Sequence, residues 1–304
     1  MGRPLGLIGI HIAAEAAPAL FFASFATPGE PIIDMNDTAR EWHLEVNAWN
    51  AGSTPVALLA DASGLSHQAV KSIMHKGAVW LERSGHIRRL RRHKAALNAG
   101  DHLHLYHDPA VLSAQTAPAM LVADEGDYSV WDKPSGMLSQ GSKWGDHTSI
   151  TRFAEARLQR VGFLVHRLDR AASGLVLVAH GKAATRVLCS LFEQRRVHKV
   201  YAVTVYGRFP TDLPVLRQPI DGRPAVSHAQ LVRYDPDHDT SQLRITIETG
   251  RKHQIRRNLA AAGFAVVGDT LYGQQNPPEE VDLQLRAVEL AFEYLGQARK
   301  YRAP

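Results

Sequence analysis

The sequence is poor in the residues on which cross-linked, membrane-spanning and cofactor-binding proteins depend. Its 304 residues include a single cysteine, Cys189, which excludes an internal disulfide framework and fits a reducing compartment. The sequence shows no uninterrupted apolar run of transmembrane length. It also lacks a phosphate-binding glycine loop and a dinucleotide fingerprint. We therefore expect a cytoplasmic protein that does not enter the membrane and needs no nucleotide cofactor.

Three histidines just after the first third of the chain raise the question of a metal site. His102 and His104 alternate with Leu103 and Leu105, and His107 follows closely. Alternation of this kind is typical of a strand whose leucines face a core, so the histidines are expected on the wet face. Their spacing matches no zinc motif. The sequence predicts no metal site.

The composition is that of a globular protein with a modest excess of positive charge. Hydrophobic residues make up 45% of the chain and charged residues 21%, and the formal net charge is +5. Such a charge permits a polyanionic partner but does not require one. Small and polar residues at 113–119 suggest a linker between a small domain, residues 35–112, and a large domain, residues 120–304.

The first 34 residues form a separate tail. An apolar, alanine-rich stretch after Arg3 superficially suggests a secretory signal, but His11, Glu15 and Pro18 interrupt it. We expect a disordered or mis-assigned extension, with Met35 as a plausible true start.

The small domain contains the densest positive run of the chain. Six basic residues between positions 83 and 94 face one nearby acid, Glu82, which is a footprint for phosphate groups. Ahead of this run, Ser66 can cap a helix that ends before Gly77, and strands are expected at 79–81 and 103–105. The residues predicted to contact phosphates are Arg88, Arg89, Arg91 and Arg92.

The large domain mixes short strands and helices without regular alternation. This pattern argues for the α+β class, with a mixed, mainly antiparallel central sheet flanked by helices. Strands are expected at 120–123, 128–131, 175–179, 200–206 and 243–248, and helices at 149–160, 182–195 and 252–262.

One pentapeptide in this domain, residues 166–170, has the chemistry of a reactive site. It places Asp169 between Arg167 and Arg170, just before a turn signal at Ser173-Gly174. Nearby arginines favour an ionised carboxylate, which suits a nucleophile and not a general acid. Alternatively, the aspartate caps a turn and is satisfied by the neighbouring arginines, as most ion pairs of this kind are structural.

Four segments in a fixed order resolve this choice through a family resemblance. Together they resemble the signature of the RluA-type RNA pseudouridine synthases. The segments are Val130–Met137, Val165–Arg170 with Ser173–Leu175, Lys199–Ala202, and Thr249–Arg257 leading to Gly268–Gly273.

The resemblance implies a mixed sheet with a central cleft and an isomerase that converts uridine in ribosomal or transfer RNA to pseudouridine. The target base would be flipped out of its stack, and no cofactor would be needed. The small domain resembles an S4-type RNA-binding module, and a monomer is expected. RNA is the expected partner.

The same resemblance assigns roles to individual residues. Asp169 matches the essential carboxylate, Tyr201 the tyrosine that stacks on the flipped base, and Arg256 the basic residue paired with the aspartate. Arg167 matches a residue that fills the gap left by the base. His166, Arg251, His253 and Gln254 are further candidates for substrate contact.

The chain departs from the family directly after the pentapeptide. Ala171-Ala172 stand where an acid and a threonine are usual, so a hydrogen bond near the aspartate must come from elsewhere or be absent.

Two other functions were weighed. A glycosidase would need a pair of carboxylates, and Asp132 and Asp269, expected in turns, offer no recognisable spacing to Asp169. A catalytically silent RNA-binding or ribosome-assembly factor is disfavoured because Asp169, Tyr201 and Arg256 are all present.

Overall fold

The computed structural model describes residues 38–273 and 281–304. The predicted tail of residues 1–34 and the proposed start at Met35 lie outside these ranges. The described strands form a four-stranded sheet and a second, ten-stranded sheet, whose ten strands include a hairpin strand and a short strand that pair on its central strands. None of the described helices is long and apolar enough to cross a membrane.

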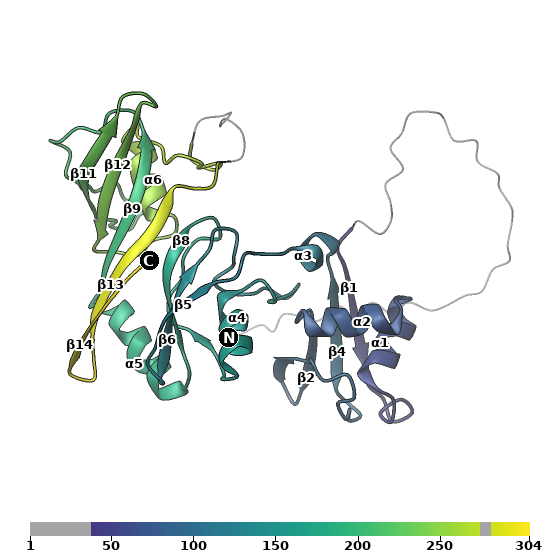
Figure 1. Cartoon of the computed structure of the whole chain (residues 1–304). Coiled ribbons are helices and arrows are strands. Elements are labelled where there is room, and N and C mark those ends of the chain that lie inside the picture. Colours follow the sequence, from purple (N-terminus) through teal and green to yellow (C-terminus); the bar gives the residue numbers. More distant parts are fainter. Residues whose placement is uncertain (1–37, 274–280) are drawn as a thin grey trace, which may run out of the picture. The chain divides into compact units, whose positions relative to one another are not determined.

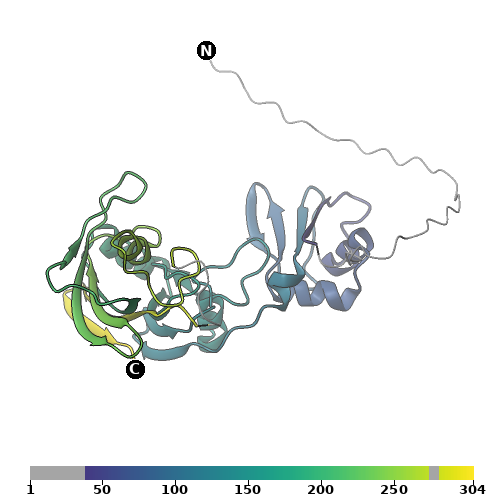
Figure 2. The ribbon, with the colours of Figure 1, turned by 90° about the horizontal axis from the view of Figure 1, so that it is seen from above.

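The small sheet lies within residues 40–107 and has two helices packed on it (Figures 1 and 2). Its strand order is β1-β4-β2-β3, and every pairing is antiparallel. Leucines 103 and 105 of β4 are fully buried with residues of both helices, as their alternation with histidines predicted. The elements are β1 (Arg40–Glu45), α1 (Pro55–Ser63), α2 (His67–His75), β2 (Val79–Arg83), β3 (His86–Arg89) and β4 (His102–His107), followed by α3 (Pro109–Ser113).

The predicted caps of α2 are confirmed. The Ser66 hydroxyl accepts a hydrogen bond from the Ala69 N–H at 3.1 Å, which satisfies one of the free donors of the first turn. Gly77 follows the helix with φ +80°, a conformation that glycine adopts without a steric cost. The strand β3 was not predicted: it holds the first part of the basic run and forms a tight hairpin with β2.

The large sheet follows the order β10-β11-β12-β9-β13-β8-β6-β5. Its pairings are antiparallel except between β8 and β13, so the predicted mixed, mainly antiparallel α+β architecture is confirmed. Its elements are β5 (Met120–Asp124), β6 (Tyr128–Lys133), α4 (Ile150–Leu158), β7 (Phe163–Leu164), β8 (Ser173–Ala179), α5 (Lys182–Glu193), β9 (His198–Tyr206), β10 (Val215–Leu216), β11 (Ser227–Asp235), β12 (Thr240–Ile247), α6 (Gln254–Ala261), β13 (Leu285–Tyr294) and β14 (Gln297–Arg302).

Strand β8 runs through the middle of this sheet and is buried on both faces. Leu175 and Leu177 pack with residues of α5, whereas Val176 and Val178 pack with residues of α4. Successive side chains of a strand point to opposite faces, so α4 and α5 cover opposite sides of the sheet. This explains why β8 is an unbroken apolar run and not an alternating one.

The predicted turn at Ser173-Gly174 is instead the beginning of β8. Gly174 has φ +108° and lies opposite Ala287 of β13, while Ala287 lies opposite Tyr201 of β9. Strand β8, which follows the Asp169 segment, and strand β9, which carries the tyrosine, thus lie on either side of β13 (Figure 1). Strand β13, which brings them together, was not predicted from the sequence.

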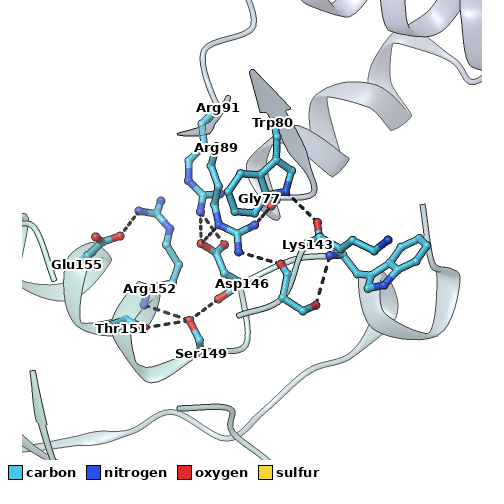
Figure 3. Close-up of polar contacts among 12 residues, drawn as sticks. Gly77, Trp80, Arg89, Arg91, Lys143, Asp146, Ser149, Thr151, Arg152 and Glu155 are labelled. Carbon is cyan, nitrogen blue, oxygen red and sulfur yellow. Dashed lines mark hydrogen bonds and ion pairs between the residues drawn. The ribbon is translucent and has the colours of Figure 1, made fainter. Parts of the chain in front are cut away.

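A contact between the basic run and the loop before α4 changes the charge balance inferred for the small domain (Figure 3). Asp146 accepts hydrogen bonds from Arg91 at 2.5 and 2.6 Å and lies 3.1 Å from Arg89 Nε. Arg89 also donates to the carbonyls of Gly77 and Ser142. Two of the four arginines predicted to contact RNA phosphates are therefore already engaged by the protein.

Gly174→Ala should lower the free energy of unfolding by about 3–5 kcal/mol. The new Cβ would overlap the backbone of Ala287, and alanine would have to keep φ +108°, so overpacking and backbone strain add. Urea denaturation followed by circular dichroism measures the effect.

Gly126→Ala is the matched control. Gly126 also has a positive φ, +79°, but no atom lies within 4 Å of its added Cβ. The control should lose only about 1–2 kcal/mol of unfolding free energy, which is what a positive φ costs alanine. Equal losses in the two variants would contradict a close approach between β8 and β13.

Candidate active site

All but one of the residues predicted in the large domain line one cavity of about 840 Å³; the exception is Arg256. This volume is ample for a nucleotide-sized ligand. The cavity lies over the centre of the sheet and is walled by the segment 163–169, the end of α5, strand β9 and the segment 249–255. The predicted residues that line it are His166, Arg167, Asp169, Tyr201, Arg251, His253 and Gln254.

Asp169 is partly open to this cavity, with 26% of its side chain exposed. The sequence suggested the neighbouring Arg167 and Arg170 as partners of Asp169, but other side chains lie beside its carboxylate. Arg256 donates to one carboxylate oxygen at 3.4 Å, and His253 Nε2 lies 3.7 Å from the other. The predicted pairing of Asp169 with Arg256 is thus present in the structure.

Arg256 is itself fixed by a second carboxylate that the sequence analysis placed in a turn. Its Nε and Nη2 atoms donate to the two oxygens of Asp269 at 2.8 and 2.6 Å, a bidentate geometry that holds the guanidinium in one plane. Only 5% of the Arg256 side chain and 1% of the Asp269 side chain are exposed. The third nitrogen, Nη1, remains for Asp169.

The environment of Asp269 keeps it ionised. Burial alone would raise its pKa, but hydrogen bonds from Arg256 and from the backbone N–H groups of Tyr272 and Leu271 outweigh burial and lower the pKa below its usual value. These N–H bonds measure 3.0 and 2.9 Å. The Gly-Asp-x-x-Tyr-Gly segment is thus both a turn and an anchor for Arg256.

His253 connects the same turn to Asp169. Its Nδ1 lies 2.9 Å from the Tyr272 hydroxyl, and its backbone has φ +54°, a conformation that costs a non-glycine residue energy and often occurs at functional sites. Burial lowers the pKa of His253 more than the neighbouring Asp169 raises it. The imidazole therefore tends to be neutral where it faces the aspartate.

The loop that carries Asp169 is held by a buried lysine. Lys133, at the end of β6, is fully buried and donates to the carbonyls of Pro134, Met137, Arg170 and Ala172 at 3.0, 2.9, 3.3 and 2.6 Å. Burial lowers the pKa of Lys133 to about 8. This lysine had no role assigned from the sequence, although it stands in the first of the four family segments.

Two serines supply hydroxyls beside the alanines that replace the usual acid and threonine. Ser135 donates to the Ala171 carbonyl at 3.0 Å. Ser139 donates to the Leu168 carbonyl at 2.6 Å and accepts from the Leu168 N–H at 2.9 Å. Hydroxyl hydrogen bonds near Asp169 are therefore supplied by the segment after β6, which binds the loop both before and after this residue.

His166 has a structural contact in addition to its place in the cavity wall. Its Nε2 accepts a hydrogen bond from the Leu177 N–H of β8 at 3.0 Å, and its ring stacks on Phe192 with 4.3 Å between centroids. Burial lowers the pKa of His166 to about 3, so the imidazole is neutral, as an acceptor must be.

Tyr201 presents a neutral phenol to the cavity. Burial and the nearby charge of Asp169 both raise the pKa of its hydroxyl, because each disfavours a second negative charge there. The ring comes from the middle of β9, where the sheet holds it rigidly between β12 and β13.

The remaining predicted residues differ in the exposure and the hydrogen bonding of their side chains. Arg167 is exposed at the cavity wall, whereas the Gln254 amide is buried and bonded to Thr249, Val226 and Ser227. The backbone N–H of Arg251 also donates to Gln254, at 3.1 Å. Gln254 therefore shapes the wall. The four arginines of the small domain that were predicted to contact phosphates do not line the cavity.

This arrangement offers one positioned carboxylate with a basic partner and an aromatic wall. The second buried carboxylate, Asp269, does not line the cavity, and its lowered pKa is the opposite of what a general acid needs. Among the described residues, no group of three histidine, cysteine or acidic side chains is placed to hold a metal ion. Glu193 also lines the cavity, but it is exposed at the end of α5. Among the described lining residues, the cavity thus offers Asp169 no buried carboxylate partner for the chemistry of a glycosidase.

Comparisons with known proteins agree with this geometry. The family model for RNA pseudouridylate synthases matches residues 127–261. An uncharacterized RNA pseudouridine synthase of Helicobacter pylori J99 is 30% identical over 212 residues, which are 60% of this chain and 72% of that protein. The dual-specificity RNA pseudouridine synthase RluA of Vibrio cholerae is 32% identical over 180 residues, 53% of this chain and 71% of that protein.

A solved structure shares the fold. Human RNA Pseudouridylate Synthase Domain Containing 1 superposes with a TM-score of 0.53 at 21% identity, covering 63% of this chain and 86% of the human one. The four ordered segments, the Arg256-bound carboxylate of Asp169 in the central cavity and the matches over most of two relatives lead to one conclusion. The chain belongs to the RNA pseudouridine synthase family and, within it, to the RluA type.

Proposed function

We propose that this protein isomerises particular uridines of ribosomal or transfer RNA to pseudouridine, with Asp169 as the catalytic carboxylate. The N1–C1′ bond breaks, the uracil turns, and C5 bonds to C1′. The proton leaves C5 and N1 gains one, so atoms and electrons balance without an oxidant, a reductant or a cofactor. The observation that carries this proposal is Asp169 held by Arg256 in a nucleotide-sized cavity beside Tyr201.

Asp169 would act at the sugar C1′, either by direct attack or by assisting cleavage through a glycal. Both routes need an ionised and oriented carboxylate. The 3.4 Å contact from Arg256 supports the charge, and the grip of Lys133, Ser135 and Ser139 on the adjacent carbonyls supports the orientation.

Tyr201 would provide the surface on which the extruded uracil stacks. Base–aromatic stacking is worth about 1–3 kcal/mol, which offsets part of the few kcal/mol that base extrusion costs. Its raised pKa favours a neutral ring over a phenolate base. Arg167, exposed at the cavity wall, would fill the space that the base leaves in the RNA.

The small domain would act as an S4-type RNA-binding module. Phosphate contacts add affinity without reading sequence, and the exposed Arg88 and Arg92 are available for them. Arg89 and Arg91, engaged by Asp146, would instead fix the segment 142–146. We expect the protein to act as a monomer in the cytoplasm and without a cofactor.

Mapping pseudouridines across ribosomal and transfer RNA, with and without this gene, tests the function directly. One or more uridines should be unmodified in RNA from the deletion strain, and the purified protein should convert them to pseudouridine in that RNA. Unchanged maps, together with stoichiometric RNA binding without product, would favour a silent RNA-binding factor.

Asp169→Asn should lower product formation at least about 10³-fold while the Kd for RNA changes little, because the group lost acts on the reacting sugar and not on the phosphates. Single-turnover assays and filter binding measure the two quantities. Asp237→Asn, at an exposed hairpin tip, is the control and should behave as wild type. Substantial turnover by Asp169→Asn would refute the assignment.

Asp269→Asn should destabilise the protein by about 3–5 kcal/mol at pH 7, because it leaves Arg256 buried without its main partner. The pKa of Asp269 is lowered on folding, so its contribution is complete above about pH 4. The difference from wild type should shrink as the pH falls through the folded-state pKa. Urea denaturation between pH 3 and 7 measures it.

Asp221→Asn is the matched control for this pair, since Asp221 binds the next residue of the same helix, Arg257, at 3.1 Å and is 71% exposed. It should change stability little at any pH. A pH-independent loss in Asp269→Asn would show that the ion pair is not its cause.

The double variant Arg88→Gln/Arg92→Gln should weaken RNA binding and reduce the slope of log K against log[salt] by about 1–2, since each phosphate contact contributes about one unit. The variant Arg89→Gln/Arg91→Gln should change the slope less, because Asp146 already balances part of this charge. Equal slopes in wild type and the first variant would exclude Arg88 and Arg92 as contacts.

A further inference from the structure

Lys199 is a largely buried lysine to which no described residue offers a hydrogen-bond acceptor or an acidic group. Only 9% of it is exposed, yet its ammonium has no hydrogen bond or ion pair with any described residue. The other two deeply buried cations of this domain are fully engaged, Lys133 by four carbonyls and Arg256 by two carboxylates. Its ammonium is not among the fully buried polar atoms without a partner, so the buried stem carries the charge to the open cavity, where a bound anion can reach it.

The ammonium belongs to the wall of the central cavity. Lys199 lines this cavity together with Tyr201, and the two residues share one face of β9 because they are two positions apart. The Lys199 Nζ atom lies 6.0 Å from the centre of the Phe192 ring. A Cβ added to Gly250 would lie 3.9 Å from it, so this glycine leaves space beside the charge.

The surroundings favour an anion at this position. Arg167, Arg195 and Arg251 also line the cavity, against the two carboxylates of Asp169 and Glu193. Burial and the charge of Arg195 lower the pKa of Lys199, which means that the site is short of negative charge. The anion that an RNA brings to such a site is a phosphodiester.

We propose that Lys199 binds a phosphate that flanks the extruded uridine and thereby sets the position of its sugar at Asp169. This inference rests on the proposed function and adds a substrate contact to it. Lys199 and Tyr201 lie about 7 Å apart along β9, so one nucleotide can place its base on the tyrosine and its phosphate at the lysine. The bond would replace water around the phosphate with a fixed, buried charge.

The test combines a protein variant with a change in one RNA phosphate. The RNA is a hairpin containing the uridine identified by the mapping, made with either natural linkages or an uncharged methylphosphonate on one side of that uridine. Lys199→Met should lower kcat/KM for natural RNA by about 10–100-fold. The methylphosphonate on the contacted side should lower wild-type kcat/KM similarly, and the two changes together should cost no more than either alone.

Three controls separate a direct contact from a structural effect. Lys199→Met should have the same or a higher Tm than wild type, because it removes a partly desolvated charge that no described residue balances and keeps the apolar stem. Lys182→Met, an exposed lysine at the start of α5, should keep wild-type kinetics. A methylphosphonate several nucleotides away should give losses that add to those of Lys199→Met.

The outcomes distinguish this proposal from the proposed function. Additive losses at both linkages, or wild-type kcat/KM in Lys199→Met, would overturn the phosphate contact while product formation stands. If wild-type protein formed no pseudouridine in any RNA, the proposed function would fail. The contact would then be judged by the Kd values of the same four combinations for a hairpin from the RNA that binds.

Discussion

The four hydrogen bonds of the Lys133 ammonium are the constraint on which the active site depends. They tie the segment after β6 to the segment that precedes β8, two stretches that come together only in the folded sheet. A buried ammonium requires acceptors in several directions at once, so the carbonyls of Arg170 and Ala172 must lie where they do. Asp169 lies in the same loop, so these hydrogen bonds also restrict its position. Ser135 and Ser139 then remove the freedom that remains.

Arg256 is positioned by one carboxylate and contacts a different one in the cavity. Asp269 takes two nitrogens of the guanidinium and is itself fixed by backbone N–H groups. The remaining nitrogen meets Asp169 at 3.4 Å, longer than the 2.6 and 2.8 Å contacts to Asp269. Arg256 is thus positioned by Asp269 and makes only a longer contact with the cavity carboxylate, which in the proposed mechanism would leave Asp169 accessible to the sugar carbon. If Asp169 were the sole partner of Arg256, one carboxylate would have to position the guanidinium and also face the cavity.

The sequence predicted what depends on neighbours along the chain and missed what depends on neighbours in space. The cap at Ser66, the apolar run of β8 and the helices α4, α5 and α6 follow from local pattern and were found. Strand β13 was missed, although it joins Gly174 to Tyr201. The resemblance identified Asp169, Tyr201 and Arg256, but not Asp269 as the partner of Arg256, because a turn aspartate and an ion-pair aspartate look alike in sequence.

The same limit explains why counting charges misjudged the basic run. Glu82 was the only acid nearby in sequence, but Asp146, more than fifty residues further on, takes Arg89 and Arg91, and Asp101 takes Arg83. The charges available to an RNA are those that the folded protein leaves unsatisfied. By that criterion the small domain offers Arg88 and Arg92 and the cavity offers Lys199, a residue that charge density along the chain would never single out. Its place in the cavity wall without an acidic partner among the described residues, which only the structure reveals, is the basis of the proposed phosphate contact.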